Sequence, residues 1–213
     1  MDTQKGNTAE VFEYEPGKVC KLFYHGIPYE YAHLEYENAQ KLFALEIRVP
    51  RPFGQIEIGG RHGIIYEKIN GISLRDCIDE EYAFQAFVRE HKKLLNISSS
   101  ELMSYKDFLL AVLQSKTGQI PSDFLGKLAT LPDGNQVLHG DYHPENIMLT
   151  PAGELVIIDL LNVCRGSAAY DVARTFFLLK DEALREKYLK AMGYRREEIA
   201  KYLDVIEITR KYE

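Results

Sequence analysis

Three oxygen-bearing side chains in the second half of the chain form a candidate site for a cation and a proton transfer. Asp141 and Asn146 are five residues apart in a polar stretch that directly follows the apolar run 137–138. Asp159 comes thirteen residues after Asn146, at the end of the apolar run 155–158. Because carboxylate and carboxamide oxygens are hard donors, Asn146 and Asp159 suit a Mg²⁺ ion that bridges nucleotide phosphates. Asp141 is then left to accept or orient the proton of an acceptor hydroxyl.

The predicted secondary structure that would hold these side chains changes near residue 72, from mainly strands to mainly helices. Before that point, short apolar runs bounded by Gly and Pro predict two strand pairs with one helix between them. The expected strands are 9–14, 19–24, 55–58 and 63–69, and the expected helix is 30–45. After that point, helices are expected over 80–95, 102–113, 123–131, 168–180, 182–192 and 196–211, interrupted by apolar runs at 136–138 and 155–158.

This order of elements predicts an α+β fold with two lobes. A small N-terminal lobe, residues 1–71, would hold an antiparallel sheet plus one helix and bind the nucleotide. A larger, mainly helical C-terminal lobe, residues 72–213, would carry the catalytic loop and the metal site. The joint near 67–71 would leave a cleft, and clefts between domains are where ligands usually bind.

The composition excludes several other classes of protein. A net charge of -6 and a pI near 5.6 leave no basic stripe for nucleic acid. Cys20, Cys77 and Cys164 form no C-x-x-C pair and indicate reduced thiols, not a disulfide framework or a zinc site. No signal-like start and no apolar run of membrane-spanning length occurs, so we expect a cytoplasmic protein without a membrane partner. The oligomeric state stays open.

The candidate site matches a known family in its joint spacing. The segment His139-Gly140-Asp141-Tyr142-His143-Pro144-Glu145-Asn146, followed by Ile157-Ile158-Asp159, resembles the aminoglycoside phosphotransferase and choline kinase branch of the protein-kinase-like superfamily. The resemblance implies that Asp141 is the catalytic base and that Asn146 and Asp159 bind Mg²⁺. It also implies that His143, which stands where protein kinases carry a lysine, faces the transferred phosphate. The glycine that follows His139 points to the small-molecule branch.

An upstream lysine supports this resemblance. Lys21 lies within the second apolar strand, an unusual place for an ammonium group unless it points into a cleft. The resemblance assigns Lys21 to the α- and β-phosphates of ATP, with a glutamate of the following helix as its partner. Glu37, sixteen residues on, fits the spacing of the family, and Glu35 is the alternative.

Three further segments resemble parts of the family. Residues 5–11, with Gly6, Asn7 and Thr8, resemble the loop that covers the phosphates, although the loop has one glycine here and not three. Residues 66–71 resemble the hinge, where the backbone of Glu67 and Ile69 would pair with the adenine edge. Residues 170–175 resemble a helix whose aspartate, here Asp171, braces the catalytic loop.

The resemblance implies an ATP-dependent kinase, with GTP as an alternative donor. It would transfer the γ-phosphate to a hydroxyl of an aminoglycoside-, choline- or sugar-like small molecule. The sequence Asp159-Leu160-Leu161 lacks the glycine that follows this aspartate in protein kinases, and no activation segment follows it, which disfavours a protein kinase. The sparse glycine loop leaves a second hypothesis, a nucleotide-binding module of the pseudokinase type that acts through a protein partner.

The histidines permit a different interpretation of the same segment. His139 and His143 flank Asp141 as H-x-D-x-H, a pattern that could belong to a zinc or iron hydrolase. Such a site needs further ligands at suitable spacings, and the remaining histidines at 25, 33, 62 and 91 are scattered. We therefore interpret His139 as a structural residue whose ring fixes the catalytic loop.

Overall fold

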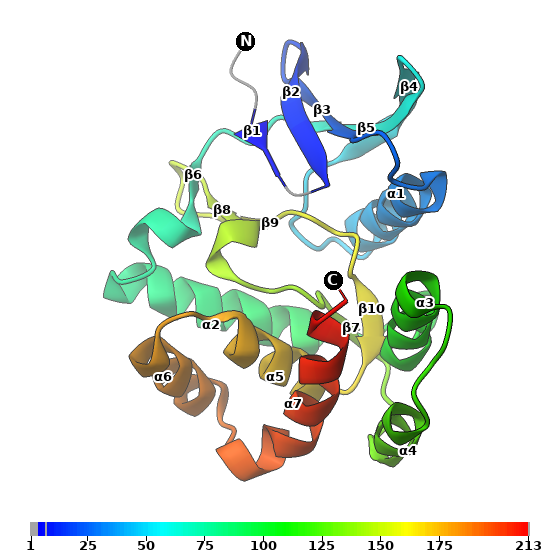
Figure 1. Ribbon diagram of the computed structural model, residues 1–213. Coiled ribbons are helices and arrows are strands. Elements are labelled where there is room, and N and C mark those ends of the chain that lie inside the picture. Colours follow the sequence, from blue (N-terminus) through cyan, green and yellow to red (C-terminus); the bar gives the residue numbers. More distant parts are fainter. Residues whose placement is uncertain (1–3, 7, 213) are drawn as a thin grey trace. The chain divides into compact units, whose positions relative to one another are not determined.

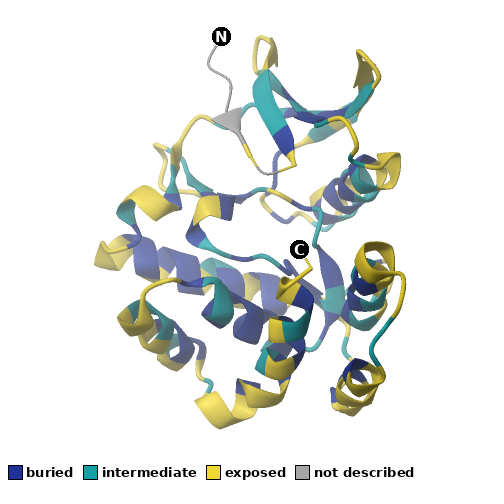
Figure 2. Cartoon of the chain, viewed as in Figure 1, coloured by how far each residue is buried: buried dark blue, intermediate teal, exposed yellow. Residues whose placement is uncertain are grey.

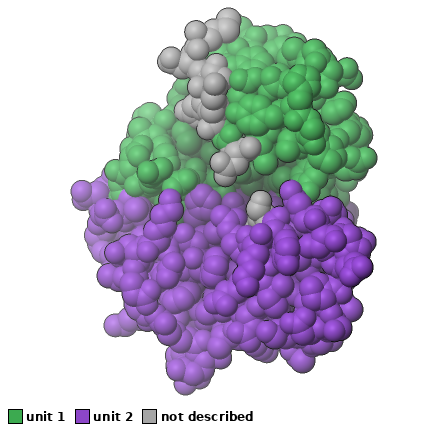
Figure 3. Space-filling view, viewed as in Figure 1, with its two compact units in different colours: residues 1–77, 144–161 green, residues 78–143, 162–213 purple. Residues whose placement is uncertain are grey.

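The computed structural model describes residues 4–6 and 8–212, which form two compact units (Figure 3). Unit 1 consists of residues 1–77 and 144–161, and unit 2 consists of residues 78–143 and 162–213. The units therefore interleave along the chain, whereas the expected lobes, 1–71 and 72–213, would be continuous. Residues 144–161, which carry Asn146 and Asp159, belong to unit 1 and not to the helical unit.

Unit 1 is built on an antiparallel sheet with the strand order β1-β2-β3-β5-β4 (Figure 1). Its strands are β1 (Gln4–Lys5), β2 (Ala9–Glu15), β3 (Lys18–Phe23), β4 (Pro52–Ile58) and β5 (Arg61–Glu67). The turn between β4 and β5 contains Gly59 and Gly60, both at positive φ (57° and 73°), as a tight two-residue hairpin requires. Helix α1 (Tyr29–Ala44) packs against β4 and β5.

A second sheet explains why residues 144–161 belong to unit 1. Its order is β6-β8-β9, and its strands are β6 (Ile72–Ser73), β8 (Ile147–Leu149) and β9 (Leu155–Ile157). The 3₁₀ turn Leu74–Cys77 follows β6 in the chain, and the 3₁₀ turn Pro144–Asn146 precedes β8. The backbone N–H of Ile157 also donates to the carbonyl oxygen of Arg48 at 3.0 Å, which ties β9 to the N-terminal part of the unit.

Unit 2 is mainly helical, and the inner faces of its helices are buried (Figure 2). Its helices are α2 (Glu81–Leu95), α3 (Tyr105–Thr117), α4 (Ser122–Thr130), α5 (Ala168–Leu178), α6 (Glu182–Met192) and α7 (Arg196–Arg210). The short strands β7 (Gln136–Leu138) and β10 (Cys164–Gly166) pair antiparallel. On α2 the spacing of Phe84, Phe87, Val88 and Leu95 produces one buried apolar face.

Caps set the ends of several helices. The hydroxyl oxygen of Ser104 accepts the N–H of Asp107, so α3 begins at Tyr105 and not at residue 102 as its apolar pattern had suggested. Gly118 and Gly193 adopt the left-handed conformation that ends α3 and α6. The predicted α+β class is confirmed, with the sheet and α1 first and the helical part after it. Among the described residues, no helix is both long and apolar enough to cross a membrane.

Candidate active site

Lys21 is the centre of a polar cluster in unit 1. It lies in β3, opposite Val11 of β2 and Ile64 of β5. Its Nζ donates to both carboxylate oxygens of Glu35 and to Oδ1 of Asp159, each at 2.8 Å. Burial alone would lower the pKa of Lys21, but the two carboxylates outweigh it and hold this pKa above its usual value. Lys21 is therefore a fixed positive charge beside Asp159.

The prediction that Glu37 is the helix partner of Lys21 is wrong, and Glu35, the alternative, takes that place. The side chain of Glu37 is 44% exposed and pairs with His33 at 3.4 Å and with Lys41 at 3.8 Å. The reason is helical geometry. Glu37 is two positions after Glu35 and therefore points to a different side of the helix. The buried side of α1 consists of Ala32, Glu35, Asn38, Ala39 and Leu42.

The two expected metal ligands, Asn146 and Asp159, lie at the same end of the β8–β9 pair. The backbone N–H of Ile158 donates to the carbonyl oxygen of Asn146 at 2.9 Å, directly beside the Ile147↔Ile157 pairing. Asn146 is 8% exposed, and the side chain of Asp159 is 47% exposed. Asp159 also has a positive φ of 61°, a conformation that is uncommon for a residue other than glycine.

This donor set fits Mg²⁺. No cluster of three or more His, Cys, Asp or Glu suitable for a metal occurs among residues 4–6 and 8–212. Mg²⁺ does not need such a cluster, because it keeps several waters and is usually held by one or two protein oxygens together with substrate phosphates. Asn146 and Asp159 can supply those two oxygens.

The expected nucleotide-covering loop and hinge are also in unit 1. The N–H of Gly6 donates to the carbonyl oxygen of Ala9 at 2.9 Å, and the carbonyl oxygen of Thr8 accepts the N–H of Tyr24 at 2.9 Å. Asn7 lies outside the described residues. Ile69 follows β5, and Glu67 ends it. The N–H of Glu67 donates to the carbonyl oxygen of Arg51 at 2.9 Å, so this N–H is already used within the unit.

The expected catalytic loop, around Asp141, follows β7 in unit 2. Gly140 has a φ of 75°, and a Cβ at this position would lie 2.3 Å from the carbonyl oxygen of Asn162, so a glycine is required. The ring Nδ1 of His139 accepts the N–H of Asp141 at 3.2 Å. His139 is completely buried, and its ring is placed as expected for a residue that fixes the loop.

Asp171 anchors this loop from α5. One carboxylate oxygen accepts the N–H of His139 and the other accepts the N–H of Gly140, both at 2.8 Å. His91 of α2 lies 3.1 Å from the same carboxylate, and the hydroxyl of Tyr188 of α6 lies 2.7 Å from the other ring nitrogen of His91. These side chains are buried, so the backbone of the catalytic loop is held by a network that joins α2, α5 and α6.

Asp141 is ionised at every ordinary pH. Burial favours its neutral form, but the hydrogen bond and charge of His143, followed by the charges of Arg174 and His139, outweigh it and lower the pKa of Asp141 to about 2. Nε2 of His143 lies 3.4 Å from Oδ2, and an Arg174 nitrogen lies 3.5 Å from Oδ1. A carboxylate this acidic is a weak base, so it is better suited to orient a hydroxyl than to remove its proton early.

Sequence reasoning missed Arg174 and His91. The guanidinium of Arg174 donates to the carbonyl oxygen of Gly140 at 3.0 Å and contacts Asp141, although only 1% of the residue is exposed. A signal was present, because Asp171 and Arg174 are opposite charges three residues apart in an otherwise apolar helix. Buried charges of this kind are normally paired. His91 lies on the apolar face of α2, where a histidine also needs a partner.

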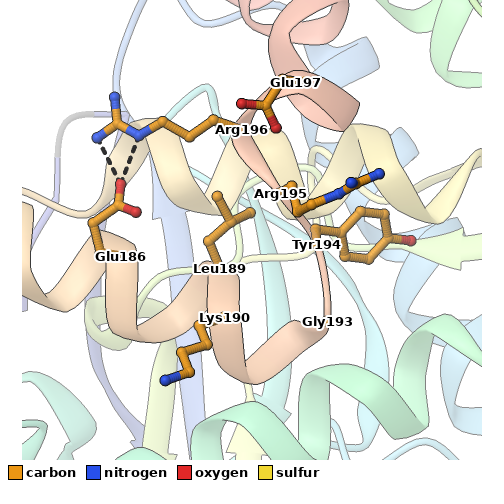
Figure 4. Close-up of a pocket in the computed structure, with 8 residues that line it drawn as sticks. All are labelled: Glu186, Leu189, Lys190, Gly193, Tyr194, Arg195, Arg196 and Glu197. Atoms are coloured by element: carbon orange, nitrogen blue, oxygen red, sulfur yellow. Dashed lines mark hydrogen bonds and ion pairs between the residues drawn. The ribbon is translucent and has the colours of Figure 1, made fainter.

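Unit 2 has a surface hollow whose lining includes none of the predicted site residues. It is formed at the turn between α6 and α7 (Figure 4). Its lining consists of Glu186, Leu189, Lys190, Gly193, Tyr194, Arg195, Arg196 and Glu197. Arg196 pairs with Glu186 at 2.6 Å, and Arg195 pairs with Glu198 at 3.1 Å. Both arginines of the lining are therefore engaged in ion pairs.

Sequence comparison decides the family. The pattern of the phosphotransferase enzyme family (APH) matches residues 5–202. The chain belongs to this family. The predicted resemblance and the predicted enzyme class, a phosphotransferase, are thereby confirmed. No curated protein sequence gives a significant match.

Solved structures show the same fold at low sequence identity. Aminoglycoside phosphotransferase APH(3'')-Id from Streptomyces rimosus is 16% identical, with a TM-score of 0.67 over 98% of this phosphotransferase and 92% of that chain. Aminoglycoside phosphotransferase APH(4)-Ia is 15% identical, with a TM-score of 0.71 over 99% and 85% of the two chains. Choline kinase LicA from Streptococcus pneumoniae is 17% identical, with a TM-score of 0.70 over 100% and 85%. The protein-kinase-like fold is therefore confirmed.

Proposed function

We propose that this phosphotransferase moves the γ-phosphate of ATP to a hydroxyl group of a small molecule. The observation that carries the proposal is the contact of Lys21 with both Glu35 and Asp159 in a member of the phosphotransferase enzyme family. This arrangement places a fixed cation beside a candidate metal ligand. Enzymes that bind nucleotide polyphosphates use both a basic side chain and a metal ion held by acidic or amide side chains.

The donor half of the proposed site belongs to unit 1. Lys21 would bind the α- and β-phosphates, and Glu35 would hold its ammonium group in place. Asn146 and Asp159 would hold Mg²⁺, which neutralises charge on the phosphates when it is bound. Gly6 and Thr8 would lie over the phosphates. The carbonyl of Glu67 and the N–H of Ile69 would pair with adenine, since the N–H of Glu67 already donates to Arg51.

The acceptor half belongs to unit 2. Asp141 would accept a hydrogen bond from the acceptor hydroxyl and orient its oxygen toward the γ-phosphorus. As the new oxygen–phosphorus bond forms, the bond to the leaving ADP oxygen breaks and the hydroxyl proton passes to Asp141. The low pKa of Asp141 indicates that this proton moves late, after most of the phosphorus bond changes. His143, which neighbours Asp141, would face the transferred phosphate.

The chain itself connects the two halves. Asp141 and Asn146 are five residues apart, and a five-residue segment spans at most about 18 Å even when it is fully extended. A chain of this length limits how far the proposed proton acceptor and the proposed metal ligand can separate.

Related structures suggest the ligand classes. The Streptomyces rimosus enzyme has been solved with ADP and streptomycin, and the APH(4)-Ia enzyme with AMP-PNP and hygromycin B. Both nucleotides are adenine nucleotides, so we propose ATP as the donor and do not propose GTP. The acceptor class is a hydroxyl-bearing small molecule of the aminoglycoside, choline or sugar type.

The test is ATP turnover with streptomycin, hygromycin B and choline as separate acceptors. We expect Mg²⁺-dependent ADP formation together with a phosphorylated acceptor, detected by mass spectrometry, and loss of both in Asp141→Asn. Thermal stabilisation by ATP without turnover on any acceptor in a broad metabolite panel would instead indicate the nucleotide-binding module. Product formation at the wild-type rate by Asp141→Asn would contradict the role of Asp141.

A further inference from the structure

Asn38 contacts the segment that follows Asp159, within unit 1. It lies on α1, one helical turn after Glu35, and is 1% exposed. Its side-chain Nδ2 donates to the carbonyl oxygen of Leu160 at 3.0 Å and approaches that of Leu161 at 3.4 Å. Glu35 of the same helix accepts the backbone N–H of Leu160. Two neighbouring side chains of α1 therefore bind both backbone groups of Leu160.

The backbone at Asp159 needs such support. Its φ of 61° belongs to the left-handed region, which L-residues adopt at a cost and which persists where the surroundings enforce it. The preceding residue is fixed, because the N–H of Ile158 donates to Asn146. The side chain of Asp159 is held by Lys21 at 2.8 Å. Asn38 adds a restraint on the carbonyl groups of the next two residues.

A buried asparagine can also serve stability alone. In that case its hydrogen bonds satisfy polar groups in a core, and their location has no functional meaning. Here the partners are the two carbonyl groups directly after a candidate metal ligand, and that ligand has an unusual backbone conformation. The location therefore argues for a role in placing Asp159.

We propose that Asn38 is a positioning residue, whose side-chain amide fixes the backbone after Asp159 in the conformation that directs the Asp159 carboxylate to Mg²⁺. The inference rests on the proposed function, since it takes Asp159 as a metal ligand. Through these contacts α1, Lys21 and the segment after Asp159 are linked within unit 1.

The first test is hydrogen–deuterium exchange of the full chain without nucleotide, comparing wild type, Asn38→Asp and Gln40→Glu. Asn38→Asp keeps the shape of the side chain but replaces the amide donor with a carboxylate oxygen, which the carbonyls of Leu160 and Leu161 would repel. Gln40→Glu makes the same chemical change at an exposed position of α1. We expect faster exchange in peptides that cover 158–162 for Asn38→Asp alone. Unchanged exchange there, or faster exchange spread over all of unit 1, would overturn the proposal.

The second test is nucleotide binding by calorimetry with and without Mg²⁺. Groups that orient a metal ligand typically change metal affinity by 10- to 100-fold, so we expect Asn38→Asp to need about tenfold more Mg²⁺ for half-maximal binding of ADP. ADP affinity in EDTA should stay within about twofold of wild type. Equal Mg²⁺ dependence in both proteins would overturn the proposal. A wild-type protein without any Mg²⁺-dependent binding would contradict the proposed function instead, and the exchange data would still decide the role of Asn38.

Discussion

The ammonium nitrogen of Lys21 lies 2.8 Å from a carboxylate oxygen of Asp159, a residue 138 positions further along the chain. The contact joins the middle of β3 to the loop after β9, and it exists while Lys21 also binds the buried carboxylate of Glu35. A single lysine thus links the sheet, α1 and the candidate metal site of unit 1. The first two predictions follow from this relationship.

Replacing Lys21 with methionine should remove its ion pairs with Glu35 and Asp159 while nearly preserving the volume of the side chain. Glu35, whose side chain is 1% exposed, would then lose its charged partner, and breaking a buried ion pair costs about 3 kcal/mol of the free energy of unfolding or more. The rate of ATP turnover should fall about 100-fold or more. Lys18→Met is the matched control, because Lys18 lies on the same strand and pairs with the exposed Glu15. Equal losses in both variants, measured by denaturation and turnover, would refute the special role of Lys21.

Glu35→Gln and Glu37→Gln should behave differently, although the two residues are close in sequence. Glu35→Gln removes the negative charge that holds Lys21, so we expect about 10-fold weaker ATP binding or more. Glu37 is half exposed and pairs with His33 and Lys41, so Glu37→Gln should change ATP affinity by less than about twofold. Isothermal titration with ATP measures both. A larger effect at Glu37 would restore the partner that the sequence first suggested.

Asp141 should stabilise the fold near neutral pH and lose that contribution in strong acid. Its pKa is lowered from 3.8 to about 2 in the folded protein, so its contribution to stability is present above pH 3.8 and is lost as the pH falls toward 2. The shift corresponds to about 2 kcal/mol. Denaturant unfolding of wild type and Asp141→Asn should show the stability difference between them shrinking by about that amount over this interval.

The same pKa has a kinetic consequence. Asp141 stays ionised above about pH 4, so any acidic limb of the turnover profile between about pH 5 and 8 must come from another group. An acidic limb in this range that disappears in a residually active Asp141→Glu or Asp141→Asn enzyme would contradict the assignment.

The buried network around Asp171 should stabilise the catalytic loop in graded steps. Asp171→Asn replaces an acceptor of two backbone N–H groups and a histidine, and we expect a loss of about 3 kcal/mol in the free energy of unfolding. Tyr188→Phe removes one hydrogen bond to His91 and should cost about 1 kcal/mol. Asp204→Asn, an exposed change on α7, should cost close to nothing. A loss for Tyr188→Phe as large as that for Asp171→Asn would argue against this order.

Local sequence patterns were sufficient to predict the class of fold and most of the helices and strands. The Gly59-Gly60 turn, the apolar face of α2 and the strand that carries Lys21 are all visible because one segment determines each of them. Contacts between distant segments were not visible. Helix periodicity alone does not decide whether Glu35 or Glu37 faces β3, since that depends on the rotation of α1 about its axis against the sheet. The structure shows that Glu35 lies on the buried face of α1, together with Ala32 and Leu42.

The short strands were missed for a related reason. β6, β8 and β10 have two or three residues each and exist because a partner from another part of the chain pairs with them. Their own sequences are too short for a periodic pattern. The same limit applies to Asn38 and Arg174, whose roles depend on the backbone carbonyls of residues far away in sequence.

The most direct measurement of the central claim is mass spectrometry of each acceptor after incubation with Mg²⁺, ATP and the protein. Streptomycin, hygromycin B and choline serve as acceptors, with Asp141→Asn as the matched inactive variant. The proposed function predicts that at least one acceptor of this hydroxyl-bearing class gains a single phosphoryl group with equal formation of ADP, and that Asp141→Asn lowers the rate by about 100-fold or more. ATP that binds the wild-type protein but is never transferred to these acceptors or to a wider panel of hydroxyl compounds would contradict it.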